Sequence, residues 1–187
     1  MQKTVEASLQ ESLKVKSNFI ESAPQIVQAA QLIVQSLKAG GKLLICGNGG
    51  SAADSQHIAA ELMGRFQTER PALAAIALSV DSSFMTAWSN DYNFDSIFER
   101  QVMGLGKVGD VLLCISTSGN SKNVLKAAKK ANEIGLTTIA LSGKDGGQLR
   151  ELCAVSIIAP SDKTAHIQEC HIAAYHSICE IIDREFS

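Results

Sequence analysis

The first part of the chain carries apolar residues at helical spacing in two stretches. The first covers about residues 4–20, and the second begins near Pro24 and has a broad apolar side. Ser22 suits the start of the second helix because Pro24 falls in its first turn, and Gly40 with Gly41 marks its end. We therefore expect two amphipathic helices before residue 40.

From residue 40 onward, short apolar runs alternate with amphipathic segments. The apolar runs predict strands at 42–46, 73–78, 111–115, 137–141 and 155–159. The segments between and after them predict helices at about 51–63, 82–89, 94–105, 122–134, 147–152 and 165–184. Short apolar strands separated by helices are typical of βαβ units with right-handed crossovers. The pattern predicts an α/β fold, a three-layer α/β/α sandwich around a parallel sheet, with N-terminal helices in front of it.

The bulk properties fit this picture and exclude several classes of protein. The chain has 187 residues, 45% of them hydrophobic, and a formal net charge of −2. This apolar content argues against disorder, and the charge argues against a surface for nucleic acid. No apolar run reaches the roughly 18 residues of a membrane span, and the N-terminus has no apolar signal core. We expect a soluble, cytoplasmic protein that binds neither nucleic acid nor membrane.

The cysteines support the same compartment. There are five, an odd number, and no two of them form a C-x-x-C pair. Three follow or interrupt apolar runs, which indicates small buried thiols in a reducing environment rather than a disulfide framework.

The most informative segment follows the predicted strand 111–115 and reads STSGNS. It leads into a helix, whose first N–H groups and positive dipole end favour an anion. Hydroxyl groups add further donors without adding charge, so the segment suits a phosphate monoester. The simpler alternative is an ordinary helix cap at Asn120 or Ser121. The hydroxyl residues are Ser116, Thr117, Ser118 and Ser121.

A second loop, 47–51, occupies the equivalent place after the strand 42–46 and reads GNGGS. Two such loops belong at the same carboxyl edge of a parallel sheet, where open α/β folds bind ligands. The loop lacks the lysine and the length of a P-loop and does not match G-x-G-x-x-G. Its simpler interpretation is a tight turn with Ser51 capping the next helix.

Polar residues also interrupt the apolar helices. His57 and Glu61 are four residues apart on the helix 51–63 and share a face, with Asp54 about one turn earlier on nearly the same side. Such a pair can bind a metal, or act as a base with its orienting partner. The alternative is a solvated face with a helix-stabilising pair.

The apolar pattern of the last helix is interrupted at Gln168, Glu169, His171 and His176. Gln168 and His176 are close to two turns apart, so they can line one side of a cleft. The alternative is a helix that faces solvent or another subunit. Two further candidates are the segment 88–91, with the only tryptophan, and Arg65, which can meet a phosphate group.

Taken together, these segments resemble the phosphoheptose isomerases, bacterial members of the SIS (sugar isomerase) superfamily. The resemblance covers nearly the whole chain and rests on CGNGGSAADSQHIAAELMGRF, AWSNDYNF, GDVLLCISTSGNSKNVLKAA, ALSGKDGG and HIQECHIAAYHSICEIID. It implies a flavodoxin-like SIS fold as one domain over 1–187, with helices for oligomer packing in 1–39 and an α/β core in 40–187.

The resemblance also implies a reaction, the conversion of sedoheptulose 7-phosphate to D-glycero-D-manno-heptose 7-phosphate through an enediol. This is the first step toward the heptose of lipopolysaccharide or related surface sugars. By the same resemblance Glu61 is the catalytic base and His176 the catalytic acid. A homotetramer with active sites at its subunit interfaces is implied as well.

The family pattern maps further residues onto this chain. One zinc ion per subunit would be held by His57, Glu61, Gln168 and His176. The substrate contacts that match are Asn48, Gly49, Gly50, Ser51, Asp91, Ser116, Thr117, Ser118, Ser121 and Gln168. The chain departs from the family just before the I-Q-E motif, where it has Ala165 and His166 in place of an acidic residue or an alanine–arginine pair. Neither His166 nor His171 receives a role.

Two other functions remain as alternatives. A non-catalytic protein of the same fold, the DnaA initiator-associating protein, lacks the equivalents of Glu61 and His176, whereas this chain has both. An isomerase or a regulator for another phosphosugar would share the fold and the phosphate loop.

Overall fold

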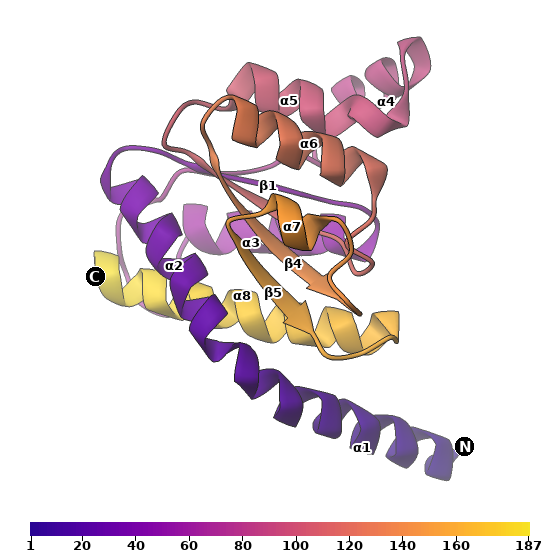
Figure 1. Ribbon diagram of the computed structural model, residues 1–187. Coiled ribbons are helices and arrows are strands. Elements are labelled where there is room, and N and C mark those ends of the chain that lie inside the picture. The colour runs from indigo at the N-terminus through magenta and orange to yellow at the C-terminus, as the bar shows by residue number, and fades with distance from the viewer.

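The computed structural model describes residues 1–187, and it begins with two helices outside the sheet. The helices α1 (Gln2–Phe19) and α2 (Ala23–Lys38) are joined by one 3₁₀ turn, Ile20–Ser22. Pro24 lies in the first turn of α2 as predicted, but the Ser22 side chain makes no capping hydrogen bond. Figure 1 shows α1 at the outer edge of the molecule, below α8.

The core is a five-stranded parallel sheet in the order β2-β1-β3-β4-β5, which is a flavodoxin-like order. This arrangement confirms the predicted fold class. The prediction was too long for β2, because only three residues pair there; its flanking residues Leu73 and Leu78 are still buried and hydrogen-bonded to Leu62 and Ile45. The strands are β1 (Leu43–Gly47), β2 (Ala75–Ala77), β3 (Val111–Ile115), β4 (Thr137–Gly143) and β5 (Val155–Ala159).

Helices cover both faces of the sheet (Figure 1). Alternate residues of a strand face the two layers. Leu43 and Ile45 pack with α2, α3 (Gly50–Met63) and α8 (Thr164–Phe186). Leu44 and Cys46 face the other layer. That layer contains α4 (Ser82–Asp91), the 3₁₀ turn Phe94–Ser96, α5 (Ile97–Leu105), α6 (Lys122–Glu133) and α7 (Leu149–Leu152).

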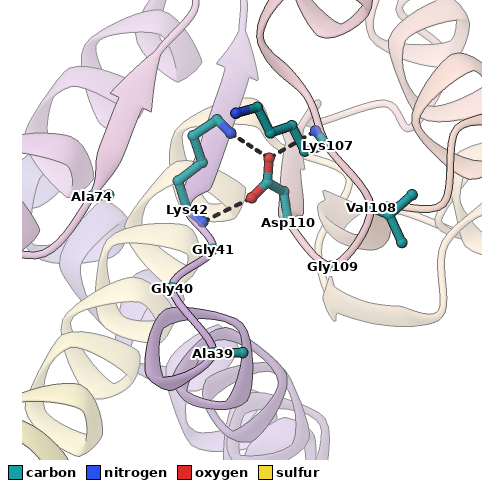
Figure 2. A pocket seen from close by; sticks show the side chains of 9 residues that line it. All are labelled: Ala39, Gly40, Gly41, Lys42, Ala74, Lys107, Val108, Gly109 and Asp110. Carbon is teal, nitrogen blue, oxygen red and sulfur yellow. Dashed lines mark hydrogen bonds and ion pairs between the residues drawn. The ribbon is translucent and has the colours of Figure 1, made fainter.

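The sheet has two chemically different edges. Loops that follow β1, β3 and β4 meet at the carboxyl edge. At the opposite edge, Figure 2 shows a pocket around Asp110, which is almost fully buried. Asp110 accepts hydrogen bonds from the backbone N–H groups of Lys42 and Lys107 and forms an ion pair with Lys42 Nζ at 2.5 Å. These bonds tie together the two turns that enter β1 and β3.

Two expectations drawn from the sequence, on disulfides and on membrane spans, can be compared with the structure. All five cysteines are free, and four of them are buried, which agrees with the predicted absence of a disulfide framework. None of the helices is both long enough and apolar enough to cross a bilayer.

Candidate active site

The loop after β3 bends back so that its hydroxyl groups face one another. Ser116 Oγ and Ser121 Oγ lie 2.9 Å apart, and the Gly119 N–H donates to the carbonyl of Ser116. Ser121 precedes α6, but its side chain makes no capping hydrogen bond to the helix. The loop is therefore more than a side-chain cap: two of its hydroxyl groups meet at the N-terminus of α6, where a helix favours an anion.

The loop after β4 supports this turn from behind. Gly119 has a φ of +64°, and a Cβ atom there would lie 1.9 Å from the carbonyl oxygen of Gly146. Asn120 Oδ1 accepts a hydrogen bond from the Gln148 N–H at 3.1 Å, and Asn120 Nδ2 donates to the Ser118 carbonyl at 2.9 Å. Only glycine fits position 119, because both the backbone conformation and the space exclude a side chain.

The loop after β1 is joined to the first turn of α6 by a pair of amides. Asn48 Nδ2 donates to Asn123 Oδ1 at 2.9 Å, and Asn123 Nδ2 donates to Asn48 Oδ1 at 2.8 Å. Gly49, not Ser51, is the residue that precedes α3, so Ser51 does not cap the helix. A Cβ atom on Gly50 would lie 2.4 Å from Gln168 Nε2, which places α8 against this loop.

These contacts define one polar surface at the carboxyl edge of the sheet, which we call the cradle. Two asparagines received no loop-joining role from the sequence: Asn120, which lies in the cradle, and Asn123, which lies beside it in α6. An asparagine in a loop or first turn is too common to be singled out from sequence alone. The cradle consists of residues 48–51, residues 116–121 and Gln168.

A second group of polar side chains lies further along α3 and α8. His57 Nε2 is 2.9 Å from Glu61 Oε1, so the predicted pair on one helix face is present. His176 joins them from α8: the candidate ligand atoms of His57, Glu61 and His176 all lie within 4.8 Å of one another. We call these three residues the His–Glu group. Phe66 stacks on the His176 ring at a centroid distance of 5.5 Å, and this contact orients the imidazole.

The far side of the His57 ring contacts a residue that sequence reasoning did not select. The Tyr175 hydroxyl is 3.0 Å from His57 Nδ1, and the Tyr175 ring is buried. Burial and the neighbouring Asp54 carboxylate raise the pKa of Tyr175 above its usual range. Asp54 is itself buried, which raises its pKa, and its Oδ2 atom has no hydrogen-bond partner. Asp54 therefore lies beneath the group rather than beside His57 on the exposed face.

A buried ion pair holds the end of α3 that carries the His–Glu group. Arg70 Nε is 2.7 Å from Asp183 Oδ1 on α8, and both side chains are almost completely buried. The Arg70 guanidinium also donates to the backbone carbonyls of Glu61 and Leu62 at 2.7 and 2.9 Å. Burial alone would raise the pKa of Asp183, but hydrogen bonds from two backbone N–H groups and from Arg70 lower it.

Two predicted contacts make no hydrogen bond or ion pair with either group. The Arg65 side chain is exposed and pairs with Glu69 at 3.1 Å. Arg65 follows the last turn of α3, whereas the cradle lies at its first turn, roughly 20 Å away along the helix. Asp91 is exposed at the end of α4, where it accepts a hydrogen bond from Asn90.

The tryptophan of the same segment is well anchored. The Trp88 ring stacks on Tyr92 at 4.1 Å, and its Nε1 donates to Ser96 Oγ at 2.9 Å. These contacts anchor the last turn of α4, which ends at Asp91.

The two histidines without a predicted role have structural surroundings. His171 Nε2 is 3.0 Å from the carbonyl of Ser142, and burial lowers the pKa of His171 to about 4. His166 is buried between Glu11 of α1 at 3.6 Å and Glu169 at 3.8 Å. His166 thus takes part in the contact between α1 and α8 rather than in either polar group.

The cradle and the His–Glu group lie at different positions along the same two helices. Gly50 and Glu61 are eleven residues apart on α3, which corresponds to about 16 Å. Gln168 and His176 are eight residues apart on α8, or about 12 Å. In one chain, the Gln168 amide contacts Gly50 and not the His–Glu group.

Comparison with known proteins gives a consistent result. Residues 9–143 match the family model described as SIS domain. The phosphoheptose isomerase of Helicobacter hepaticus is 52% identical over 185 residues, which cover 99% of this chain and 94% of that protein. The phosphoheptose isomerase of Aquifex aeolicus is 51% identical, with 98% and 96% covered.

Solved structures agree with the sequence comparisons. The phosphoheptose isomerase GmhA from Neisseria gonorrhoeae has a TM-score of 0.92 and 46% identity, with 98% of each chain covered. A phosphoheptose isomerase from Francisella tularensis has a TM-score of 0.94 and 40% identity, with the same coverage.

Proposed function

The chain belongs to the SIS domain family and, within it, to the phosphoheptose isomerases, and from that premise we propose that it interconverts sedoheptulose 7-phosphate and D-glycero-D-manno-heptose 7-phosphate. The observation that carries the proposal is that Glu61 and His176, from two helices, converge in one half-buried group beside the exposed His57. The reaction would take place in the cytoplasm, as the first step toward the heptose of lipopolysaccharide or a related surface sugar.

The cradle is the binding site for the phosphate end of the substrate. Its hydroxyl groups and the free N–H groups at the start of α6 supply donors for a phosphate dianion. The reciprocal amide pair of Asn48 and Asn123 fixes the first loop beside it, so Asn48, Gly49, Gly50 and Ser51 can contact the sugar. Asp91 and Arg65, whose side chains are exposed, are assigned as further substrate contacts.

The chemistry follows from a carboxylate and an imidazole facing the same carbons. In the ketose-to-aldose direction, Glu61 removes a proton from C1 while His176 protonates the C2 carbonyl oxygen, which gives an enediol. Glu61 then returns its proton to C2, and His176 accepts the proton of the C1 hydroxyl, which leaves the aldose and restores both residues. Arg70 supports this step by fixing the backbone of Glu61.

The His–Glu group also suits a zinc ion, and we assign one per subunit. Two imidazoles and one carboxylate form a donor set of catalytic zinc sites. His57 Nδ1 contacts Tyr175, so Nε2, which faces Glu61 at 2.9 Å, is the nitrogen turned toward the position of the metal. Bound zinc would polarise the substrate carbonyl. Glu61 cannot serve fully as ligand and as base at once, so activity after exhaustive chelation, with metal content measured, decides whether zinc is required.

A single chain does not bring all these residues to one substrate. An extended seven-carbon sugar phosphate measures on the order of 10 Å from phosphorus to C1 at ordinary bond lengths, less than the separation of about 16 Å along α3. Gln168 likewise reaches the zinc only from another subunit. We assign a homotetramer with active sites at its interfaces. The exposed apolar side chains of the N-terminal helices offer a packing surface: Val5, Leu9, Leu13 and Ile20.

The decisive experiment is a proton NMR assay of purified protein with sedoheptulose 7-phosphate and added zinc. We expect the anomeric signals of the aldose to grow with the wild type. Glu61→Gln should lower turnover roughly 10²- to 10⁴-fold while substrate still binds. Glu180→Gln is the matched control, since Glu180 pairs only with Arg184 on the surface of α8.

The outcomes of this assay separate the alternatives. Near wild-type turnover by Glu61→Gln would remove Glu61 from the mechanism. An absence of turnover by the wild-type oligomer would favour another phosphosugar or a non-catalytic role like that of the DnaA initiator-associating protein. The presence of both Glu61 and His176 in one group favours the isomerase.

A further inference from the structure

Tyr175 connects the His–Glu group to a buried carboxylate. Its hydroxyl is 3.0 Å from His57 Nδ1, on the side of the ring opposite Glu61. The carboxylate of Asp54 lies close to the same hydroxyl, and its Oδ2 atom is buried without any hydrogen-bond partner. Asp54 and His57 belong to α3, whereas Tyr175 comes from α8, so the contact crosses between the two helices.

The two nitrogens of His57 have different partners, and these partners bear on which nitrogen carries the proton. Nε2 is 2.9 Å from Glu61 Oε1, in the same group as His176. A neutral imidazole that offers Nε2 to a cation must carry its proton on Nδ1. That proton needs an acceptor, and the Tyr175 oxygen is in place. The phenolic hydrogen then needs an acceptor of its own, and the unpartnered Asp54 carboxylate supplies one.

We propose that Tyr175 and Asp54 are positioning residues, which hold His57 with its proton on Nδ1 and so present Nε2, together with Glu61 and His176, to a divalent cation. The inference rests on the proposed function to the extent that the cation is zinc. In this arrangement His57 Nδ1–H would donate to the Tyr175 oxygen, across the 3.0 Å contact that the structure shows, and the Tyr175 hydroxyl would donate in turn to the buried, unpartnered Asp54 carboxylate. A ligand histidine whose second nitrogen is bonded in this way is fixed in both orientation and tautomer.

The hydroxyl has a function separable from that of the ring. The Tyr175 ring is almost fully buried and makes edge contacts with the rings of His57 and His176, at 5.4 and 4.7 Å. Phenylalanine retains that ring and those contacts and removes only the hydroxyl. Tyr175→Phe therefore tests the hydrogen bonds without opening a cavity. The other tyrosine, Tyr92, is exposed at the end of α4, so Tyr92→Phe is the matched control.

The test measures the zinc affinity of the metal-free, full-length oligomer by competition with a chromophoric chelator. We expect Tyr175→Phe to weaken zinc binding about 10- to 100-fold, the usual effect of removing the partner of a ligand histidine. Tyr92→Phe should bind zinc as the wild type does. Asp54→Asn should weaken binding on its own, because it replaces the charged acceptor by an amide.

A double variant tests whether the three residues act in series. If Asp54 acts through Tyr175, adding Asp54→Asn to Tyr175→Phe should change zinc affinity no further. Ring ¹⁵N spectra of the zinc-loaded protein give a second readout, since they report which nitrogen of His57 carries the proton. We expect the Nδ1–H form to dominate in the wild type and to lose its hydrogen-bonded proton signal in Tyr175→Phe.

The outcomes distinguish this inference from the proposed function. If Tyr175→Phe binds zinc as tightly as the wild type does, the positioning role is overturned and the zinc site stands. A wild type that fails to bind zinc would overturn both. Independent, additive effects of the two substitutions would exclude a series, and Asp54→Asn in the wild-type background covers the case in which Tyr175→Phe does not fold.

Discussion

The guanidinium group of Arg70 donates a hydrogen bond to the backbone carbonyl of Glu61 across 2.7 Å. The same group forms a buried ion pair with Asp183, at the opposite end of α8 from the cradle. The residue assigned as the catalytic base is therefore held through its own backbone by a charge pair that is almost completely buried.

We expect Arg70→Ala to destabilise the protein by about 3–5 kcal/mol, because it leaves a buried carboxylate without its partner. Urea unfolding measures this loss. The control is Arg184→Ala, whose exposed pair with Glu180 should contribute no more than about 1 kcal/mol. Equal losses in the two variants would show that burial of the Arg70 pair is energetically unimportant.

Two glycines with positive φ separate backbone strain from steric clash. Gly40→Ala, at a φ of +80° with open space around it, should cost about 1 kcal/mol from strain alone. Gly119→Ala adds a clash with the Gly146 carbonyl and should cost on the order of 2 kcal/mol more. It should also raise the KM for the sugar phosphate, since the cradle must open. An unchanged KM would separate Gly119 from substrate binding.

The lowered pKa of His171 should make the stability of the protein depend on pH. Burial lowers its pKa from 6.5 to about 4, so the unfolded chain binds more protons than the folded chain between these values. Stability should therefore fall as the pH drops from 6.5 to 4, by roughly 3 kcal/mol from this residue. His171→Gln, which can still donate to Ser142, should flatten this part of the curve. An identical slope in both proteins would contradict the assignment.

Mixed oligomers test whether an active site draws on two chains. One variant, Glu61→Gln, lacks the base, and another, Ser116→Ala with Ser121→Ala, has a disabled cradle. Purified hetero-oligomers of the two should be more active than either parent, because some interfaces then combine an intact cradle with an intact base. Mixtures no more active than their parents would mean that each site is built within one chain.

The fold could be predicted from the sequence because each strand and helix has its own local pattern of apolar residues. The apolar runs of β1, β3 and β5 and the helical periodicity between them are local, and the parallel order follows from the alternation. The four-residue spacing of His57 and Glu61 likewise places both on one face before any packing is known. The paired loops of the cradle follow from the two similar strand–loop–helix units.

What the sequence could not supply depends on contacts between helices. Tyr175 in an apolar helix is typical of a core residue, and its bond to His57 exists only because α8 packs on α3. Arg70 follows a turn rich in polar residues, where an ion pair with Asp183, more than a hundred positions away, leaves no local pattern. His166, where the chain departs from the family pattern, contacts Glu11 of α1. Helical periodicity predicts α1 but not that it packs along α8, so this contact could not be predicted.

The single tryptophan gives the protein a built-in optical reporter. Trp88 is fixed by its stack on Tyr92 and its bond to Ser96, three residues before the assigned substrate contact Asp91. Because the chain has no other indole, its tryptophan emission, excited at wavelengths that tyrosine does not absorb, comes from one place, the end of α4. A change in emission on adding a sugar phosphate would report the arrival of ligand at this segment in the unmodified protein, without a label and independently of turnover.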